Sequence, residues 1–364
     1  MCKIATGRSN VVSFHGGYHG HGQSMLALMG NLGAKSPVQG LMPEVHFLPY
    51  PYHFRQPFGI SDPEEADKAV MKYIETALTD DESGIPKPAC VVVEAIQGEG
   101  GVQPMSPWAL RELRRITKEA DIPLVLDEVQ AGFCRSGKFF AFQHSETGDA
   151  APADVHGKGT AEKCEGVAAA APGCTADQSC GSCSYAGIEP DVVCVSKAVG
   201  GGMPMACIAF TEELNKWAPA AHTGTFRGNQ IGFATGAAGI KFMKEQRLWE
   251  AAASKGEWLR ARMEALQAEL PFIGDVRGRG LMLGVELVQP GTADHTGVPL
   301  PHGELAAATQ KRAFHQNKLI IEKGGRHGAV LRFLPPLTVE QDELERGVEL
   351  FEKSLRDAAA EMAM

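Results

Sequence analysis

Short apolar runs that end directly in glycine and polar residues recur through the first 200 residues of this chain. Four runs share this design: "NVVSF" (10–14), "ACVVVEAI" (89–96), "IPLVLDEV" (122–129) and "DVVCVSKAV" (191–199). Unbroken Val, Ile and Leu positions without polar alternation are typical of strands that are covered on both faces, as in a parallel sheet. The pattern therefore predicts a mostly parallel sheet between layers of helices.

Helical patterns separate these predicted strands. In residues 106–120, Ser106 stands in the N-cap position before Pro107, a residue suited to the first turn of a helix. Strand, glycine-rich loop and helix in alternation indicate a doubly wound α/β domain.

The pattern changes after a long helical stretch at about 230–268. The elements predicted beyond it are a strand pair (271–288), a helix (about 303–317), the strands "LIIEK" and "AVLRFLPP", and an amphipathic helix from about 339. We therefore expect a large domain over residues 1–270 and a small C-terminal α+β domain over residues 271–364.

Residues 145–187, referred to below as the insertion, break the pattern. They are rich in Ala, Gly, Ser and Pro and poor in large apolar residues, a composition that predicts a flexible surface segment. The insertion contains His156 and four cysteines: Cys164, Cys174, Cys180 and Cys183. Their spacing matches no two-pair zinc pattern, so metal binding is the minor alternative and no metal site is expected.

Composition and charge argue against a protein that binds nucleic acid or spans a membrane. The chain has 364 residues, of which 44% are hydrophobic and 22% charged, with a net charge of −9 and a pI near 5.8. Without a basic run, neither nucleic acid nor an anionic membrane is an expected partner. No apolar stretch has the length of a bilayer span, and the first residues lack a signal-peptide core. The cysteines then read as reduced thiols, and we expect a cytoplasmic protein, with an organelle as the alternative.

Polar side chains follow each of the four apolar runs at the point where the run ends. They are, in chain order, His15, Tyr18 and His19; Glu94 and Glu99; Asp127 and Gln130; and Lys197. In open α/β sheets, ligands bind at the carboxyl ends of the strands. The sequence therefore predicts one ligand site along this edge.

Lys197 and Asp127 indicate the chemistry of that site. A partly desolvated lysine amine attacks carbonyl carbons, and a nearby aspartate can hold a proton on a cationic ring. This pair is what pyridoxal phosphate requires, and Tyr18 could stack on its ring. Taken singly, each residue has an ordinary explanation as a solvated charge, a helix cap or a packing contact. Together they favour the cofactor.

The same residues lie in motifs that resemble a known family. "LVLDEVQAGFCRSG" (124–137) followed by "VSKAVGGGMPM" (195–205) is similar to the signature of class III aminotransferases, which are fold-type I pyridoxal-phosphate enzymes. "EAIQGEGGVQP" (94–104), "GTFRGNQ" (224–230) and "LRFLPPLTV" (331–339) match further blocks in the same order. The resemblance covers nearly the whole chain except the insertion.

The resemblance implies a role for each candidate residue. Lys197 would hold the cofactor as a Schiff base and move a proton between substrate and cofactor, and Asp127 would pair with the pyridine nitrogen. Further cofactor contacts would come from Gln130 on the phenolic oxygen, Tyr18 on the ring face, His19 and Glu94 nearby, and Thr225, which in a homodimer would reach the phosphate of the other subunit's cofactor.

The resemblance also implies how substrates bind. Arg332 would clamp the α-carboxylate of the keto acid, while Glu99 would pair with Arg332 when a diamine is bound and release it when glutamate enters. "HGGYHG", "LMPEVHFLPYPY" and "HTGTFRGNQ" are most similar to members that transfer the terminal amino group between L-2,4-diaminobutyrate and 2-oxoglutarate. Ornithine, acetylornithine and 4-aminobutyrate are the alternative donors.

The chain departs from the family pattern in three respects. It begins at what resembles the second strand region, so we expect the N-terminal segment and the phosphate-binding loop to be missing and cofactor binding to be weakened. A non-catalytic remnant with a dimerising or metal-binding role is the alternative to an active enzyme. His21 stands where ornithine-type relatives carry an arginine for the distal carboxylate. Asp127 and Lys197 lie 70 positions apart, more than is usual, and the insertion accounts for the excess.

Overall fold

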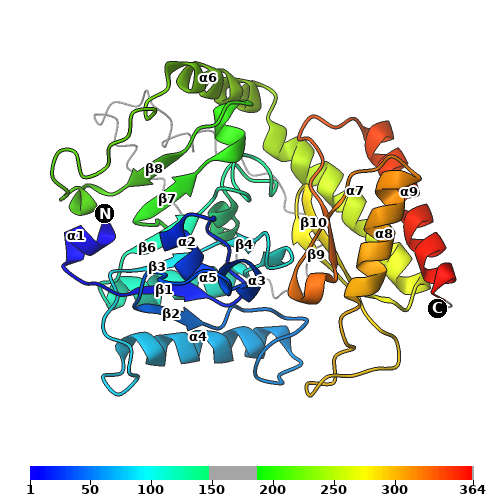
Figure 1. The fold of residues 1–364 in the computed structure, drawn as a ribbon, viewed down its shortest axis with the longest axis horizontal. Coiled ribbons are helices and arrows are strands. Elements are labelled where there is room, and N and C mark those ends of the chain that lie inside the picture. Colours follow the sequence, from blue (N-terminus) through cyan, green and yellow to red (C-terminus); the bar gives the residue numbers. More distant parts are fainter. Residues whose placement is uncertain (147–186, 363–364) are drawn as a thin grey trace.

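The computed structural model describes residues 1–146 and 187–362, and its largest element is a six-stranded sheet (Figure 1). The strand order is β2-β1-β3-β6-β7-β8. The strands are β1 (Val11–Phe14), β2 (Val45–Leu48), β3 (Cys90–Val93), β6 (Leu124–Asp127), β7 (Val192–Val195) and β8 (Cys207–Phe210). The first five are parallel, which confirms the predicted mostly parallel α/β sheet, and β8 runs antiparallel to β7 at one edge.

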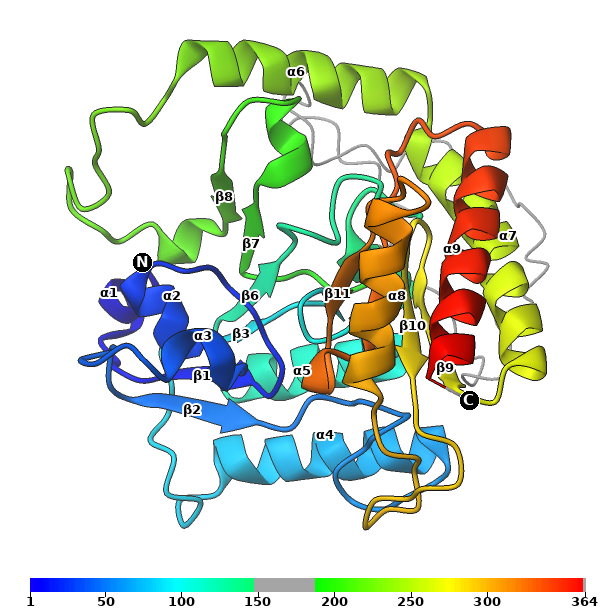
Figure 2. The same ribbon diagram turned by 45° about the vertical axis from the view of Figure 1, so that its right-hand side comes forward.

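Six helices belong to this part of the described chain, and those at residues 23–28, 63–79 and 107–119 bury apolar residues against the sheet. They are α1 (Cys2–Thr6), α2 (Gln23–Leu28), α3 (Leu32–Lys35), α4 (Pro63–Thr79), α5 (Pro107–Glu119) and α6 (Gln230–Glu245). Figure 2 shows α4 and α5 together along one side of the sheet, where their apolar faces enter the core beneath β1, β3 and β6. Helix α5 begins as predicted, because Ser106 accepts a hydrogen bond from the Ala109 N–H at 3.0 Å and Pro107 occupies its first turn.

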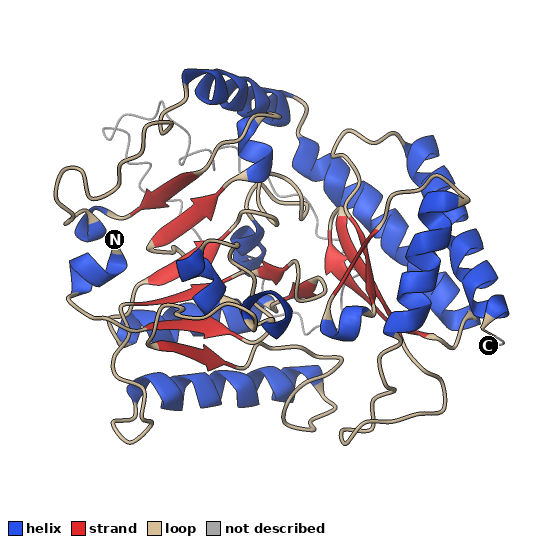
Figure 3. Ribbon diagram, viewed as in Figure 1, coloured by secondary structure: helices blue, strands red, loops and turns tan. Residues whose placement is uncertain are grey.

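A second sheet, antiparallel and four-stranded, has a core of its own. Its order is β11-β12-β10-β9, with β9 (Ile273–Arg279), β10 (Met282–Leu287), β11 (Glu322–Gly324) and β12 (Val330–Phe333). Helices α7 (Leu248–Glu269), α8 (Gly303–His315) and α9 (Gln341–Glu361) pack on it and gather on its outer side in Figure 3. Most of these elements lie where the sequence predicts them, but β11 overlaps only the end of the predicted strand "LIIEK", and α7, predicted within the large domain, packs on this second core. The long helical stretch is divided at Arg247, whose φ of 47° interrupts the helix.

Short elements complete the described chain. They are the two-stranded ribbon β4 (Ile96–Gln97) and β5 (Gln103–Pro104), and the 3₁₀ turns η1 (Ala141–Glu146), η2 (Lys197–Gly200), η3 (Glu212–Leu214) and η4 (Arg326–Gly328). None of the helices in the described ranges is long and apolar enough to cross a membrane. The insertion lies almost entirely outside the described residues, and so do its His156 and four cysteines.

A buried carboxyl group organises the loop that follows β6. Glu128 is 1% exposed and accepts hydrogen bonds from the backbone N–H groups of Ala141 at 2.8 Å and Phe142 at 2.9 Å. Burial raises the pKa of Glu128 to about 7, because an apolar environment disfavours the charged form. Glu128 thus fixes the start of η1 against the end of β6.

The core of the second sheet predicts a large cost for one truncation. The Phe351 ring of α9 is fully buried and meets the Phe333 ring edge-on, with centroids 4.8 Å apart. We expect Phe351→Ala to lower the free energy of unfolding in urea by about 3–5 kcal/mol, because it removes the ring and leaves a cavity. The matched control is Phe314→Ala on α8, where the side chain is 53% exposed and the expected change is within about 0.5 kcal/mol. Equal losses in the two variants would contradict this packing.

The raised pKa of Glu128 predicts a pH-dependent contribution to stability. The unfolded chain releases this proton near pH 4.5, whereas the folded chain keeps it until about pH 7. Between these values the unfolded state binds fewer protons, so stability falls as pH rises. We expect the stability of the wild type relative to Glu128→Gln to decrease by about 3 kcal/mol across this window, and to level off above it. Urea titrations at pH 5, 6, 7 and 8 measure the difference, and a difference independent of pH would refute the assignment.

Candidate functional site

The parallel register brings the polar residues of the four apolar runs to one edge of the large sheet. Strands β1, β3, β6 and β7 are consecutive neighbours, so their carboxyl ends align at intervals of about 4.8 Å. Asp127 closes β6 opposite Cys194 of β7, and Lys197 follows three residues later. The structure thus places the residues that the sequence analysis selected after these strands along a single edge.

Asp127 is held by contacts to both of its carboxylate oxygens. One oxygen lies 2.9 Å from Nδ1 of His19, and the other accepts the backbone N–H of Val129 at 3.0 Å. Burial alone would lower the pKa of His19, but the hydrogen bond to Asp127 and the nearby Glu94 outweigh it, so the pKa is raised. His19 therefore stands beside Asp127 as its hydrogen-bond partner, and its Nε2 is buried without a hydrogen-bond partner in the described chain.

Glu94 connects the loops that follow β1 and β3. Its carboxyl oxygens accept the backbone N–H groups of Tyr18 and Gly98, each at 3.0 Å. The side chain is buried, and burial raises the pKa of Glu94 to about 7, although the charge of His19 opposes the shift. Glu94 thereby positions Tyr18 at the edge of the sheet.

Tyr18 and Gln130 lie on the same side of this edge. The Tyr18 ring is partly exposed and meets the His21 ring edge-on at a centroid distance of 5.5 Å. Burial raises the pKa of its hydroxyl, with further contributions from Glu99 and Glu94. The Gln130 amide lies directly on the Gly98 backbone, where an added Cβ would come within 1.5 Å of its oxygen. A side chain at position 98 would therefore displace the Gln130 amide from this place.

Lys197 is exposed, and its ammonium group has no hydrogen bond or ion pair within the described ranges. Its backbone φ is 51°, in the left-handed region that non-glycine residues seldom adopt. The preceding Ser196 donates its hydroxyl to the Met205 carbonyl at 2.7 Å, which fastens the turn. The structure therefore presents an unpaired amine one strand away from Asp127.

Arg332 lies on β12 of the second sheet. It contacts Glu99, which lies in the loop that follows β3 of the large sheet. Its guanidinium is 4% exposed and contacts both oxygens of Glu99, at 2.7 and 3.3 Å. Glu322, directly opposite Arg332 in the register of β11 and β12, supplies a second carboxylate at 3.0 Å. Such a fork is suited to binding a ligand carboxylate, provided that Glu99 moves away.

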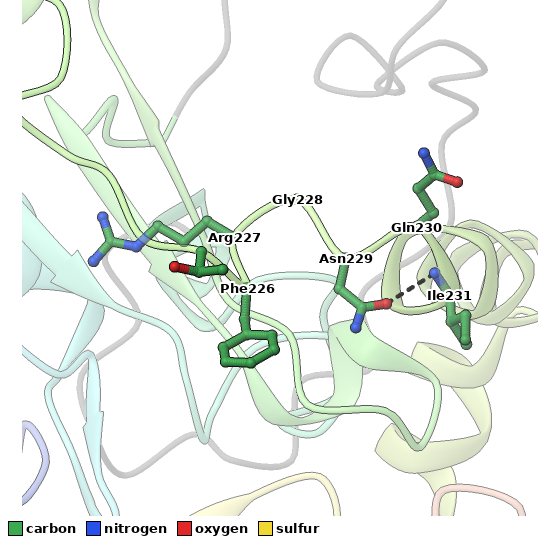
Figure 4. Close-up of a pocket in the computed structure, with 7 residues that line it drawn as sticks. Phe226, Arg227, Gly228, Asn229, Gln230 and Ile231 are labelled. Carbon is green, nitrogen blue, oxygen red and sulfur yellow. Dashed lines mark hydrogen bonds between the residues drawn. The ribbon is translucent and has the colours of Figure 1, made fainter.

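Thr225 lies apart, on an exposed loop before α6. An open cavity of about 270 Å³ is lined by residues 225–231 (Figure 4). The Phe226 side chain is 89% exposed and, like that of Arg227, extends outward from the loop in Figure 4. No hydrogen bond or ion pair within the described ranges joins Thr225 to Asp127 or Lys197 of the same chain.

Two charged residues at this edge escaped the sequence analysis. Glu322 contacts Arg332 through the register of a short hairpin, and Arg326 lies on η4 between the strands of that hairpin. Both belong to "EKGGR" (322–326), a polar stretch between strands that carries no signal of its own. Among the described residues, no group of three or more His, Cys, Asp or Glu side chains is arranged to hold a metal ion.

The residues at the edge suit pyridoxal phosphate. Asp127, hydrogen-bonded to His19, can accept a hydrogen bond from a protonated ring nitrogen, and the unpaired Lys197 amine can attack an aldehyde. Nε2 of His19 is buried without a partner among the described residues, and the Tyr18 side chain next to it in the chain is partly exposed. The donor set fits the aldehyde and pyridine groups that the sequence analysis expects.

Comparisons with known proteins agree with this assignment. The profile of the family described as aminotransferase class-III matches residues 1–177 and 173–355. Two relatives named diaminobutyrate–2-oxoglutarate aminotransferase, from Haemophilus influenzae and Rhizobium meliloti, are each 44% identical to this chain. The alignments cover 98% and 95% of this chain, and 70% and 65% of those proteins.

Solved structures show the same fold. An amine transaminase from an uncultivated Pseudomonas species superposes with a TM-score of 0.77 at 22% identity, covering 98% of this chain and 72% of that one. An omega-transaminase from Thermomicrobium roseum gives a TM-score of 0.77 at 23% identity, covering 98% and 71%. The family expected from the sequence motifs is confirmed: this chain belongs to the class III aminotransferases.

Proposed function

We propose that this chain is a pyridoxal-phosphate aminotransferase that moves the terminal amino group between L-2,4-diaminobutyrate and 2-oxoglutarate. Family membership supports the cofactor and the reaction class, and the names of the two relatives at 44% identity support the substrates. The observation that carries the proposal is the buried Arg332 with Glu99 across its fork. This arrangement is a carboxylate-binding site covered by a displaceable carboxylate.

Each residue at the sheet edge has a separate role in the proposed reaction. Pyridoxal phosphate, when bound, supplies an electron sink for the carbanion at the substrate carbon. Asp127, paired with His19, holds the proton on the ring nitrogen. Nζ of Lys197 would take the proton from the donor carbon that bears the amino group and, in the second half-reaction, would deliver a proton to the keto carbon of 2-oxoglutarate. Glu94 fixes the Tyr18 loop through the Tyr18 N–H, and Tyr18 covers one face of the ring.

Arg332 and Glu99 explain how one pocket accepts two unlike substrates. The reacting carbon of diaminobutyrate carries no carboxylate, so Arg332 stays neutralised by Glu99 while this donor is bound. The reacting carbon of 2-oxoglutarate does carry one, and this carboxylate replaces Glu99 on the guanidinium. A buried guanidinium left without a partner would be costly, and the exchange keeps it paired in both half-reactions.

We extend the proposal to the assembly and its location. The exposed Thr225 loop and the 89% exposed Phe226 support a homodimer in which Thr225 contacts the phosphate at the other subunit's site. The cysteines within the described ranges are free thiols, as a reducing compartment keeps them, which supports the cytoplasm. The separate cores of the two sheets support a large and a small domain, proposed as 1–270 and 271–364, although α7 before this boundary packs in the core of the second sheet.

The role of Lys197 predicts where the cofactor attaches. After incubation with pyridoxal phosphate and reduction with borohydride, we expect the pyridoxyl mass on the peptide that contains Lys197. Lys197→Ala should lose that mass and at least about 10²–10⁴-fold of transamination, because no other group at the edge replaces the amine. Lys353→Ala, on the exposed surface of α9, is the control and should behave as wild type. Labelling or turnover that survives in Lys197→Ala would refute the assignment.

The exchange on Arg332 predicts opposite effects on the two substrates. Glu99→Gln removes the charge that competes for the guanidinium, so KM for 2-oxoglutarate should fall about tenfold while KM for diaminobutyrate rises by a similar factor. The exposed Glu349→Gln on α9 is the matched control. Steady-state kinetics with each substrate varied in turn measures both constants. A rise of both KM values together would contradict the exchange and indicate a merely structural role for Glu99.

A further inference from the structure

The proposed substrates share a second carboxylate, and this inference rests on the proposed function. In L-2,4-diaminobutyrate and in 2-oxoglutarate, the same number of carbon–carbon bonds separates the reacting carbon from a carboxylate at the far end. Arg332 serves only the carboxylate on the reacting carbon, which the donor lacks. A second cation at the same edge is therefore needed to hold the far carboxylate of both molecules.

The structure attaches η4 firmly to this edge. The Gly325 N–H donates to the carbonyl oxygen of Glu99 at 3.1 Å. A Cβ added at Gly101 would meet the Gly325 Cα at 3.0 Å, so the two loops touch through their backbones. Arg326 follows Gly325 directly and belongs to the hairpin that carries Arg332. The loop that covers Arg332 and the turn that carries Arg326 therefore form one unit.

Arg326 is a cation without an acidic partner in the described ranges. Its guanidinium carbon lies 5.1 Å from the centroid of the Tyr52 ring, and the residue is exposed. Tyr52 is itself fixed, because its hydroxyl hydrogen-bonds to the buried Glu286. Arg277 approaches the same ring, also at 5.1 Å, but its guanidinium is engaged by Asp275 and Glu286. Of the two arginines that contact the Tyr52 ring, only Arg326 has a guanidinium that no carboxylate of the described residues neutralises.

Arg326 also lies close to the carboxyl end of β1. Partial burial lowers the pKa of His15, and the positive charge of Arg326 lowers it further. His15 immediately follows β1, which is separated from β6 and Asp127 by β3 alone. A guanidinium in this neighbourhood, stacked on an aromatic ring with its N–H donors free, is suited to binding a carboxylate.

We propose that Arg326 binds the distal carboxylate of both substrates, which is the γ-carboxylate of 2-oxoglutarate and the α-carboxylate of diaminobutyrate. Arg326 then sets the length and the charge of the molecules that react, while Arg332 distinguishes the two half-reactions. His21 stands where ornithine-type relatives carry an arginine, but it has no guanidinium fork, and its ring lies edge-on to Tyr18. The stacked Arg326 takes that role instead.

Substrates that differ only in the distal carboxylate provide the test. For Arg326→Gln in the holoenzyme, we expect KM to rise about tenfold or more for 2-oxoglutarate and for diaminobutyrate. The constants for 2-oxopentanoate and 1,3-diaminopropane, which lack that carboxylate, should stay within about twofold of wild type. Arg326→Lys should restore part of the loss, because it restores the charge without the planar fork. Arg346→Gln, exposed on α9, is the control.

A binding measurement separates this inference from the proposed function. Titration calorimetry of the holoenzyme with glutarate, a dicarboxylate that cannot react, should give a dissociation constant about tenfold weaker in Arg326→Gln than in wild type. Unchanged KM and glutarate binding, or equal losses with and without the distal carboxylate, would overturn the assignment of Arg326. A wild type that binds glutarate through Arg326 but does not transaminate diaminobutyrate would instead refute the proposed function alone.

Discussion

The parallel alignment of β1, β3, β6 and β7 is the constraint on which the candidate site depends. Parallel strands that are hydrogen-bonded in register must end at the same edge, and the polar residues that follow them are brought together without any long-range signal in the sequence. Apolar burial fixes the register, because a shift by one residue would turn the core side chains of each strand to the opposite face. The chemistry of the edge is therefore a consequence of how the core packs.

The buried carboxyl groups near this edge each require hydrogen-bond partners, and these partners fix the neighbouring loops. Asp127 is paired with His19, and Glu94 and Glu128 are each satisfied by two backbone N–H groups. A buried ionisable group without such partners would cost several kcal/mol. The same contacts set the positions of the Tyr18 loop and of the start of η1. The hydrogen bonds that satisfy these buried carboxyl groups thus also set the geometry of the site.

The two sheets meet through the groups proposed to bind substrate. Arg332 of the second sheet contacts Glu99 of the loop that follows β3, and Gly325 binds the backbone of the same loop. The loop that carries Glu99 is therefore bound both to Arg332 and to the turn that carries Arg326. In this arrangement, recognition of a carboxylate is coupled to the contact between the sheets, and two arginines on one hairpin can measure the length of a substrate.

The sequence by itself determined the mostly parallel sheet, the start of α5 at Ser106 and the placement of Asp127 and Lys197 at one edge of the sheet. These follow from unbroken apolar runs, a local cap and motif spacing, all of which are written in contiguous residues. Only the tertiary structure decided the reversed edge strand β8, the contact of Glu322 with Arg332 and the stacking of Arg326 on Tyr52. Those contacts join segments that are distant in the chain or depend on strand register, and side-chain chemistry alone does not specify which partners the packed core will bring within reach.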